Sequence, residues 1–325
     1  MYIDAHLHIA DYLDCCAADN IPAQFASPAA FCCSAHEHDE YVRHHAFALA
    51  HAHAHAQETP PSHAAGIITD DAAKLKRDGN GYPLQHGAAH PAISRCRQRH
   101  ALFSFGIHPQ NPVMDEADFL YHLLETKQVQ AIGECGFDLF DETFKQTLPQ
   151  QLKVWQLQTQ WAAQFQLPLV IHCRKALPLL FESVPQLKKV PSVIVHGWGG
   201  SPQEAASFLK KGVNAYFSLG KATLRGQKSV CAMAARFEIQ RLLTETDAPY
   251  MRLKAERFTH PRGIIAVTAL CATLRKNPDH PIMQYDSCAA VLAATAPADE
   301  ELEYFSDIME QNFYRAFGIS CQNAF

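Results

Sequence analysis

Two histidines near the start of the chain are spaced for metal binding. Segment 2–8, YIDAHLH, places His6 and His8 two positions apart at the end of a short apolar run. On a β-strand, residues i and i+2 point to the same face, so both imidazoles would converge on one point. Two neutral imidazoles held close together are a start on a divalent-metal site. An HxH pair is a weak signal by itself, and its value depends on matching ligands elsewhere.

Further nitrogen and oxygen donors stand at the ends of later apolar runs. They are His108 in GIHP, Glu134 in AIGECGFD, His172 in PLVIHCR, His196 in VIVHGW and Asp247 in LLTETDAPY. Singly, each has an ordinary alternative, such as a hydrogen-bonded core histidine or an aspartate that caps the next helix. Four of the five histidines and the two carboxylates can together ligate two divalent metals if one carboxylate bridges. Such a set suits zinc or manganese better than magnesium, which prefers oxygen ligands and water.

The elements that would position these donors alternate along the chain. Near-continuous apolar character predicts eight strands covered on both faces, with amphipathic segments between them. The strands are expected at 2–8, 29–35, 101–108, 130–137, 168–174, 191–198, 214–220 and 241–247. This pattern predicts an α/β fold, a TIM (β/α)8 barrel, in which the carboxyl ends of all strands surround a single mouth.

Helical spacing of apolar residues predicts helices at 145–166 and 202–211, the second opened by Ser201-Pro202 and closed by Gly212. Another helix is expected to end near Ala56. The stretch 57–99 is rich in proline, histidine, glycine and charge, and we interpret it as a loop insertion after the second strand–helix unit. The whole chain, 1–325, is then expected to form one barrel domain.

Composition excludes some classes of protein. A net charge of −5 over 325 residues gives no basic surface of the kind that wraps nucleic acid. The absence of an apolar run approaching 18 residues predicts no membrane span. Eleven cysteines without a CxxC pair, and no signal-peptide pattern at Met1, favour reduced thiols in a cytoplasmic protein. The histidines at 44, 45, 51, 53 and 55 are interpreted as an alanine-rich helix end or loop rather than a metal-storage tract.

The motifs together resemble the TatD family of metal-dependent hydrolases, within the wider amidohydrolase-like barrels. The matching segments are DAHLH, GIHP, AIGECGFD, PLVIHCR, VHGWGGS and LLTETDAPY, from residue 2 to about residue 251 outside 57–99. A weaker similarity continues to 312–317. The resemblance implies a deoxyribonuclease, commonly a 3′-to-5′ exonuclease acting on DNA ends, with two divalent metal ions (Zn, Mn or Mg).

The resemblance also implies roles for individual residues. One metal would be held by His6, His8, Glu134 and Asp247, and Glu134 would bridge to a second held by His172 and His196. His108 looks like the family's substrate-facing histidine, and His108 or Arg174 would bind a substrate phosphate. We expect the metals to lower the pKa of a water between them to ~7 and Asp247 to accept its proton. Glu245 would at most orient a ligand.

The sequence departs from the family pattern on the substrate side. Lys175 follows Arg174 where the family usually has an acidic residue, His196-Gly197-Trp198 replaces His-Cys-Phe, and Ile264-Ile265-Ala266 stands where Asn-Glu-Pro is usual. A hydrolase of small amide, ester or lactone substrates on the same barrel is therefore an alternative. A non-catalytic metal-binding protein is a third, less favoured because the ligand set is complete. No obligate protein partner is indicated.

Overall fold

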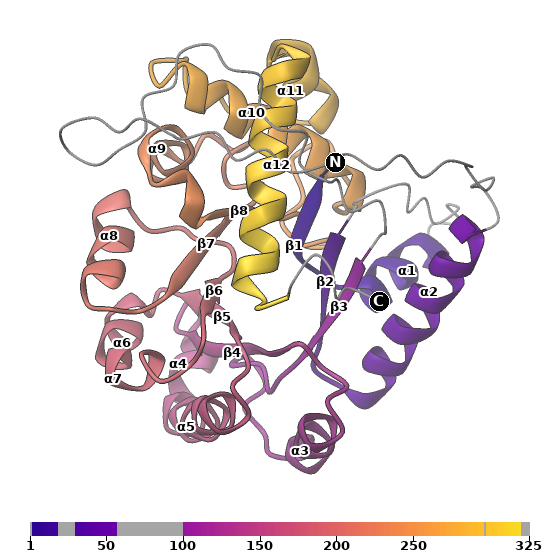
Figure 1. The fold of residues 1–325 in the computed structure, drawn as a ribbon, viewed down its shortest axis with the longest axis vertical. Helices are drawn as coiled ribbons and strands as arrows, with labels where there is room; N and C mark the ends of the chain where they lie inside the picture. Colours follow the sequence, from indigo (N-terminus) through magenta and orange to yellow (C-terminus); the bar gives the residue numbers. More distant parts are fainter. Residues whose placement is uncertain (1, 19–29, 57–99, 296, 320–325) are drawn as a thin grey trace, which may run out of the picture.

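Eight parallel strands form the centre of the protein. The computed structural model describes residues 2–18, 30–56, 100–295 and 297–319. The strands pair in sequence order around a barrel, and all eight predicted strands are confirmed (Figure 1). They are β1 (Ile3–Leu7), β2 (Ala30–Ala35), β3 (His100–Phe105), β4 (Ala131–Asp138), β5 (Leu169–Arg174), β6 (Val193–Val195), β7 (Ala215–Leu219) and β8 (Leu242–Thr244).

The barrel is closed where the chain leaving β8 meets β1. The backbone N–H and the hydroxyl of Thr246 both donate hydrogen bonds to the buried Asp4 carboxylate, at 2.9 and 2.6 Å. One residue further on, the N–H of Asp247 donates to the carbonyl oxygen of His6 at 3.0 Å. These bonds bring the two ends of the strand order together and set Asp247 beside the first strand.

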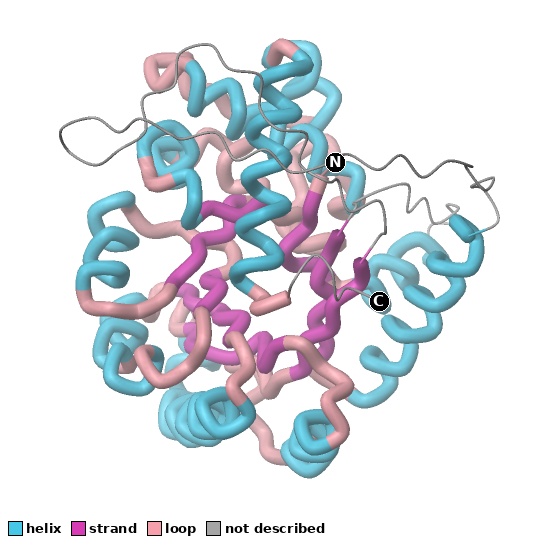
Figure 2. The backbone as a smooth tube through the Cα atoms, viewed as in Figure 1, coloured by secondary structure: helices cyan, strands magenta, loops and turns pink. Residues whose placement is uncertain are grey.

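Helices surround the strands, as Figure 2 shows. This alternation confirms the predicted TIM-barrel architecture. The helices are α1 (Ile9–Ala18), α2 (His38–Ala56), α3 (Ala117–Glu125), α4 (Glu142–Gln146), α5 (Leu148–Phe165), α6 (Leu177–Glu182), α7 (Val184–Leu187), α8 (Pro202–Lys210), α9 (Lys228–Arg236), α10 (Ile264–Lys276), α11 (Cys288–Thr295) and α12 (Asp299–Ala316), with 3₁₀ turns η1 (Ile239–Arg241) and η2 (Pro261–Gly263). None of the helices in these described ranges is long and apolar enough to cross a membrane.

Local sequence explains where two of the helices begin. The predicted helix 145–166 is two helices, because α5 restarts at Leu148 with a proline in its first turn, which cannot donate to the preceding turn. The preceding helix, α4, begins earlier than predicted, since the side chain of Asp141 caps it by accepting from the N–H of Thr143. Helix α8 confirms the prediction for 202–211: Ser201 and Glu204 form a capping box around its first turn.

The last helix covers one end of the barrel. In Figure 1, α12 lies across the strands, and its Asn312 side chain donates to the carbonyl oxygens of Ile239 and Leu242 at the start of β8. The hydroxyl of Ser192, which precedes β6, donates to the carbonyl oxygen of Ala316. Helix α12 therefore closes the amino-terminal end of the strands and leaves the opposite end for the candidate site.

The histidine-rich stretch belongs to helix α2, as the interpretation of an alanine-rich helix end expects. His44 is buried, and burial lowers the pKa of its imidazole to about 3. The ring of His45 stacks on Phe103 with centroids 3.8 Å apart. His45 therefore packs against β3, and His44 is part of the buried interior. The insertion predicted at 57–99 follows this helix and lies outside the described residues.

Glycine at position 136 permits the close approach of β4 and β5 beside the site. Gly136 has φ +135°, and an added Cβ would overlap the carbonyl oxygen of His172 on the neighbouring strand. Backbone atoms of paired strands cannot move aside without breaking the ladder.

We predict that Gly136→Ala lowers the free energy of unfolding by about 3 kcal/mol or more, since backbone strain and overlap add. The measurement is chemical denaturation followed by circular dichroism. Gly318→Ala is the matched control: Gly318 has φ +66° with no atom within 4 Å of an added Cβ. Gly318→Ala should lower the free energy of unfolding by only about 1–2 kcal/mol, the cost of a left-handed backbone conformation for a residue with a Cβ. Equal losses in the two variants would contradict the overlap.

Candidate metal centre

Eight side chains converge at the open end of the barrel. Seven of them are the predicted His6, His8, His108, Glu134, His172, His196 and Asp247, and the eighth is His36. Strand β1 supplies His6, and His8 directly follows it; β4 and β5 supply Glu134 and His172. His108 follows β3, His196 directly follows β6, and Asp247 lies three residues beyond β8. The parallel barrel brings these distant positions together because its strands all end on one side.

The Glu134 carboxylate lies at the centre of the cluster, with one oxygen facing each of two groups of imidazoles. Its Oε1 is 3.3 Å from Nε2 of His6 and 3.1 Å from Nε2 of His8. Its Oε2 is 2.6 Å from Nε2 of His196 and 3.5 Å from Nδ1 of His172. The side chain is only 3% exposed, so these groups, rather than water, surround its charge.

Asp247 lies on the first of these two sides. Its Oδ1 is 3.7 Å from Nε2 of both His6 and His8. The residue has φ +57°, a left-handed conformation that aspartate adopts more readily than most residues. With 16% of its side chain exposed, Asp247 is reached by solvent, whereas Glu134 is not.

Groups behind the imidazoles hold their orientation. Nδ1 of His6 is 3.0 Å from Oγ of Ser34, which in turn is 2.7 Å from Oγ of Ser104. Nε2 of His172 is 3.1 Å from Oδ2 of the buried Asp138. Each contact occupies one ring nitrogen and leaves the other directed at Glu134, an arrangement typical of histidines that bind metals.

Glu245 stands behind His196 in the same way, at a longer distance. Its Oε1 accepts the N–H of Gly197 at 2.7 Å and lies 3.8 Å from Nδ1 of His196. Glu245 thus faces His196, and its expected role, to orient a ligand at most, stays a prediction.

Burial and mutual charge shift the pKa values of the cluster. Burial lowers the pKa of His6 to about 4. Burial opposes ionisation of Glu134, but the His6 and His196 imidazoles outweigh it and hold the carboxyl pKa well below its usual range. Burial raises the pKa of Asp247 to about 7 against the opposing His196 and His8. Positive charge next to these buried carboxylates is therefore strongly favoured.

The donor set fits divalent cations. Imidazole nitrogens approach one another closely, with 3.2 Å between Nε2 of His6 and Nε2 of His8 and 3.1 Å between Nδ1 of His172 and Nε2 of His196. Nitrogen donors that converge on a shared carboxylate suit zinc or manganese. The cluster can therefore hold metal, as the sequence pattern predicts.

Arg174, predicted to contact substrate, lies beside the cluster rather than in it. Its guanidinium stacks on the ring of Phe140, 3.6 Å from the ring centroid. The two residues line a cavity of about 460 Å³ next to the site, together with Cys173, Lys175, Leu177, Val195, Gly197, Trp198, Gly199, Gly200, Glu204 and Gln227. Because Cys173 and Gly197 directly follow His172 and His196, this groove opens beside the metal-binding cluster.

Two members of the site were not predicted from the sequence. His36 follows β2 directly, and its Nε2 is 3.1 Å from Oε1 of Glu134. Its position after an apolar run is the same signal that revealed the other donors. Asp138 ends β4 in the motif GECGFD, but only the fold shows that it faces His172.

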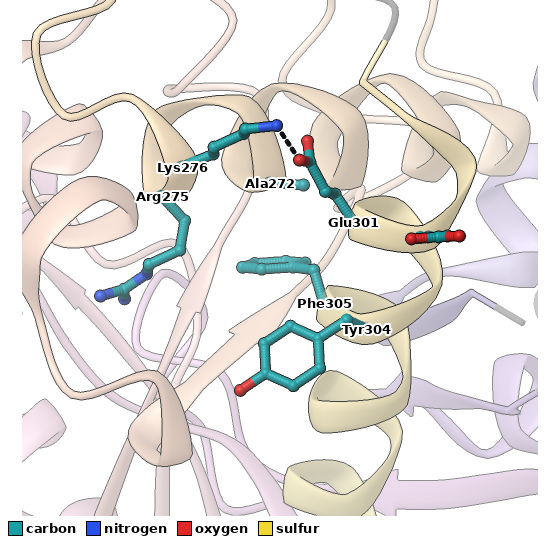
Figure 3. Close-up of a pocket in the computed structure, with 7 residues that line it drawn as sticks. Ala272, Arg275, Lys276, Glu301, Tyr304 and Phe305 are labelled. Carbon is teal, nitrogen blue, oxygen red and sulfur yellow. Dashed lines mark hydrogen bonds and ion pairs between the residues drawn. The ribbon is translucent and has the colours of Figure 1, made fainter. Parts of the chain in front are cut away.

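A second hollow, of about 360 Å³, lies between α10 and α12 (Figure 3). It is lined by Ala272, Arg275, Lys276, Glu300, Glu301, Tyr304 and Phe305. Lys276 forms an ion pair with Glu301 across it. None of the clustered histidines contributes to its lining, so we do not assign it to the site.

We predict that Asp138→Asn weakens zinc binding ~10–100-fold, because the variant no longer presents a carboxylate to His172. The measurement is zinc affinity by competition with a chromophoric chelator. Asp141→Asn is the matched control, since this exposed aspartate caps α4 and asparagine caps equally well. An unchanged zinc affinity in Asp138→Asn would contradict the orienting role.

A (β/α)8 barrel with a histidine–carboxylate cluster at its mouth defines a class of metal-binding barrels. A family model described as TatD related DNase matches residues 3–318. The chain belongs to this family.

Relatives and solved structures agree with the assignment. The 3′-5′ ssDNA/RNA exonuclease TatD of Pectobacterium parmentieri is 32% identical over 150 residues, 45% of this chain and 57% of the relative. The protein of the same name from Dickeya dadantii is 33% identical over 161 residues, which are 48% of this chain and 59% of the relative. The aligned parts thus span less than two thirds of these relatives.

Two crystal structures share the fold along nearly the whole chain. A TatD homologue from Escherichia coli K12 is 19% identical with a TM-score of 0.62, covering 98% of both chains. A hydrolase TatD family protein from Entamoeba histolytica is 14% identical with a TM-score of 0.58, covering 97% of both.

Proposed function

We propose that this protein is a divalent-metal-dependent phosphodiesterase that removes nucleotides from the 3′ ends of DNA. The observation that carries the proposal is the Glu134 carboxylate, whose two oxygens face separate groups of imidazoles. A carboxylate in that position can bridge two cations. The relatives named 3′-5′ ssDNA/RNA exonuclease support the choice of substrate.

In this proposal one cation would be held by His6, His8, Glu134 and Asp247, and a second by Glu134, His172 and His196. Bound cations would supply hydroxide at neutral pH by lowering the pKa of water to about 7, and would polarise the phosphoryl oxygen. Mononuclear binding would leave one of the two groups of imidazoles unused.

The protein's own side chains then have distinct tasks. Asp247, the solvent-reached carboxylate of the cluster, accepts the proton of the attacking water and passes it to bulk solvent. The P–O bond to the rest of the strand breaks as water attacks, and solvent protonates the leaving oxygen. His108, 15% exposed, lies 3.8 Å from Glu134 through Nε2 and donates to a phosphoryl oxygen of the substrate. Glu134 is too enclosed for proton exchange and stays ionised.

The groove beside the cluster suits a single strand. Phe140 is 53% exposed, and Arg174 covers one face of its ring. An aromatic platform with cations next to it, here Arg174 and Lys175, is the usual pairing for a base and its phosphate.

We propose a one-domain protein of the cytoplasm, in keeping with the free thiols of the nine cysteines within the described residues.

We predict that the protein releases mononucleotides from 3′-labelled single-stranded DNA with Mg²⁺, Mn²⁺ or Zn²⁺. EDTA, His6→Ala and Glu134→Ala should each abolish release, and elemental analysis of the wild type should give two ions per chain. His122→Ala is the matched control, because this exposed histidine of α3 lies outside the cluster. Full activity of Glu134→Ala, or hydrolysis of a lactone or amide panel without nucleotide release, would contradict the proposal.

Phe140→Ala should raise KM for an oligonucleotide ~5–100-fold, since stacking contributes about 1–3 kcal/mol per base. Turnover of a small phosphodiester such as bis(p-nitrophenyl) phosphate should be unchanged, because it has no neighbouring base. Phe140→Trp should keep the wild-type KM. Tyr304→Ala removes an equally exposed aromatic from the hollow of Figure 3 and serves as the control. An unchanged KM in Phe140→Ala would contradict the proposal that the groove binds the substrate.

A further inference from the structure

His36 occupies a position among the metal-binding side chains that no motif assigned. It is the first residue after β2, and its Nε2 lies 3.1 Å from Oε1 of Glu134, the same distance as Nε2 of His8. Its ring centroid is 5.5 Å from that of His8. His8, His36 and Glu134 therefore form a set of donors that converge on one point.

The hydrogen bonds of His36 direct an unprotonated nitrogen at this point. Its Nδ1 is 3.3 Å from the carbonyl oxygen of Gly106, which only accepts, so Nδ1 carries the hydrogen. In the neutral ring, Nε2 then presents a lone pair to the Glu134 carboxylate. Two acceptors 3.1 Å apart repel unless positive charge lies between them, and the neighbouring imidazoles make a divalent cation the natural occupant.

Backbone contacts fix His36 in this position. Its N–H donates to Oε2 of Glu40 at 2.8 Å, in the first turn of α2. The acceptor at Gly106 is equally constrained, because an added Cβ there would lie 2.8 Å from the backbone of Gly133. The ring is therefore held from β2 and from the residue that follows β3.

His108, next to His36, has the opposite arrangement. The N–H of Gln110 donates to Nδ1 of His108 at 3.3 Å, so the hydrogen of the neutral ring is on Nε2. That Nε2–H, 3.8 Å from Oε2 of Glu134, is a hydrogen-bond donor and not a ligand. The two neighbouring histidines, whose centroids are 4.8 Å apart, thus differ in which nitrogen faces the site.

Given the proposed metal centre, we infer that His36 is an additional ligand of the cation bound by His8 and Glu134, and that His108 is not a ligand. The first cation then has one more imidazole than the motifs supply. An added nitrogen donor favours zinc over magnesium, which prefers oxygen.

The test is metal binding by His36→Asn. The asparagine amide can still donate to the carbonyl oxygen of Gly106 but has no Nε2 to offer. We expect zinc affinity at one of two sites to fall at least ~10-fold, and the visible spectrum of the Co²⁺-loaded protein to change. His36→Ala is the second variant, and His108→Ala is the control, with wild-type zinc affinity and Co²⁺ spectrum. Thermal unfolding of the metal-free proteins checks that each variant folds.

The outcomes separate this inference from the proposed function. Wild-type affinity and an unchanged Co²⁺ spectrum in His36→Asn and His36→Ala would overturn the ligand role of His36 and leave the metal centre standing. Loss of zinc in His108→Ala, with none in the His36 variants, would reverse the two assignments. A wild-type protein that binds no divalent metal would overturn both.

Discussion

The charge of Glu134, enclosed at the mouth of the barrel, is the constraint on which the site depends. A carboxylate that is 3% exposed loses almost all its hydration, and an unpaired charge in such a place costs several kcal/mol, about 3–5 when a partner is removed. The imidazoles around it compensate only when protons or cations supply positive charge. Because each carboxylate oxygen faces a different group of histidines, that charge has two places to bind.

The barrel makes this arrangement possible with local, regular pairing. Each strand pairs with its neighbour in sequence, so every carboxyl end reaches the same side. The opposite end is covered by α12, which hydrogen-bonds to the first residues of β8. Closure between β1 and the chain after β8 is made by Asp4 and Thr246, and the same stretch sets Asp247 beside His6. The bonds that close the barrel therefore also position Asp247, a carboxylate of the cluster that could hold a metal ion.

Residues behind the imidazoles extend the site to strands that supply none of the predicted ligands. Ser34 of β2 and Ser104 of β3 support His6, and Gly106 after β3 supports His36. Asp138 supports His172 and also accepts the N–H of Phe140, the aromatic residue of the groove. One carboxylate thus connects a metal-binding imidazole to the surface proposed to bind the base. In the proposed function, metal affinity and substrate position would therefore depend on a common set of contacts.

The sequence by itself determined the strands and most of the cluster. Buried parallel strands appear as short apolar runs, and donors at their ends must meet in a barrel, so the six predicted ligands and His108 could be located without coordinates. Features that apolar spacing does not encode could not be located in this way. The helix at 145–166 is broken by a proline in the first turn of α5, and the cap at Asp141 makes α4 begin before residue 145; apolar spacing alone reveals neither.

Only the tertiary structure decided the finer roles. In the sequence, His36 stands just before an acidic turn and resembles the start of a helix. Its proposed role as a ligand depends on the contact of its Nδ1 with the carbonyl oxygen of Gly106, seventy residues away. Arg174 stays a predicted phosphate contact, and the structure adds that its guanidinium stacks on Phe140, because β4 and β5 bring the two loops together. Sequence spacing identifies which donors reach the mouth. The direction of each ring nitrogen depends on hydrogen bonds between strands, which exist only once the barrel is closed.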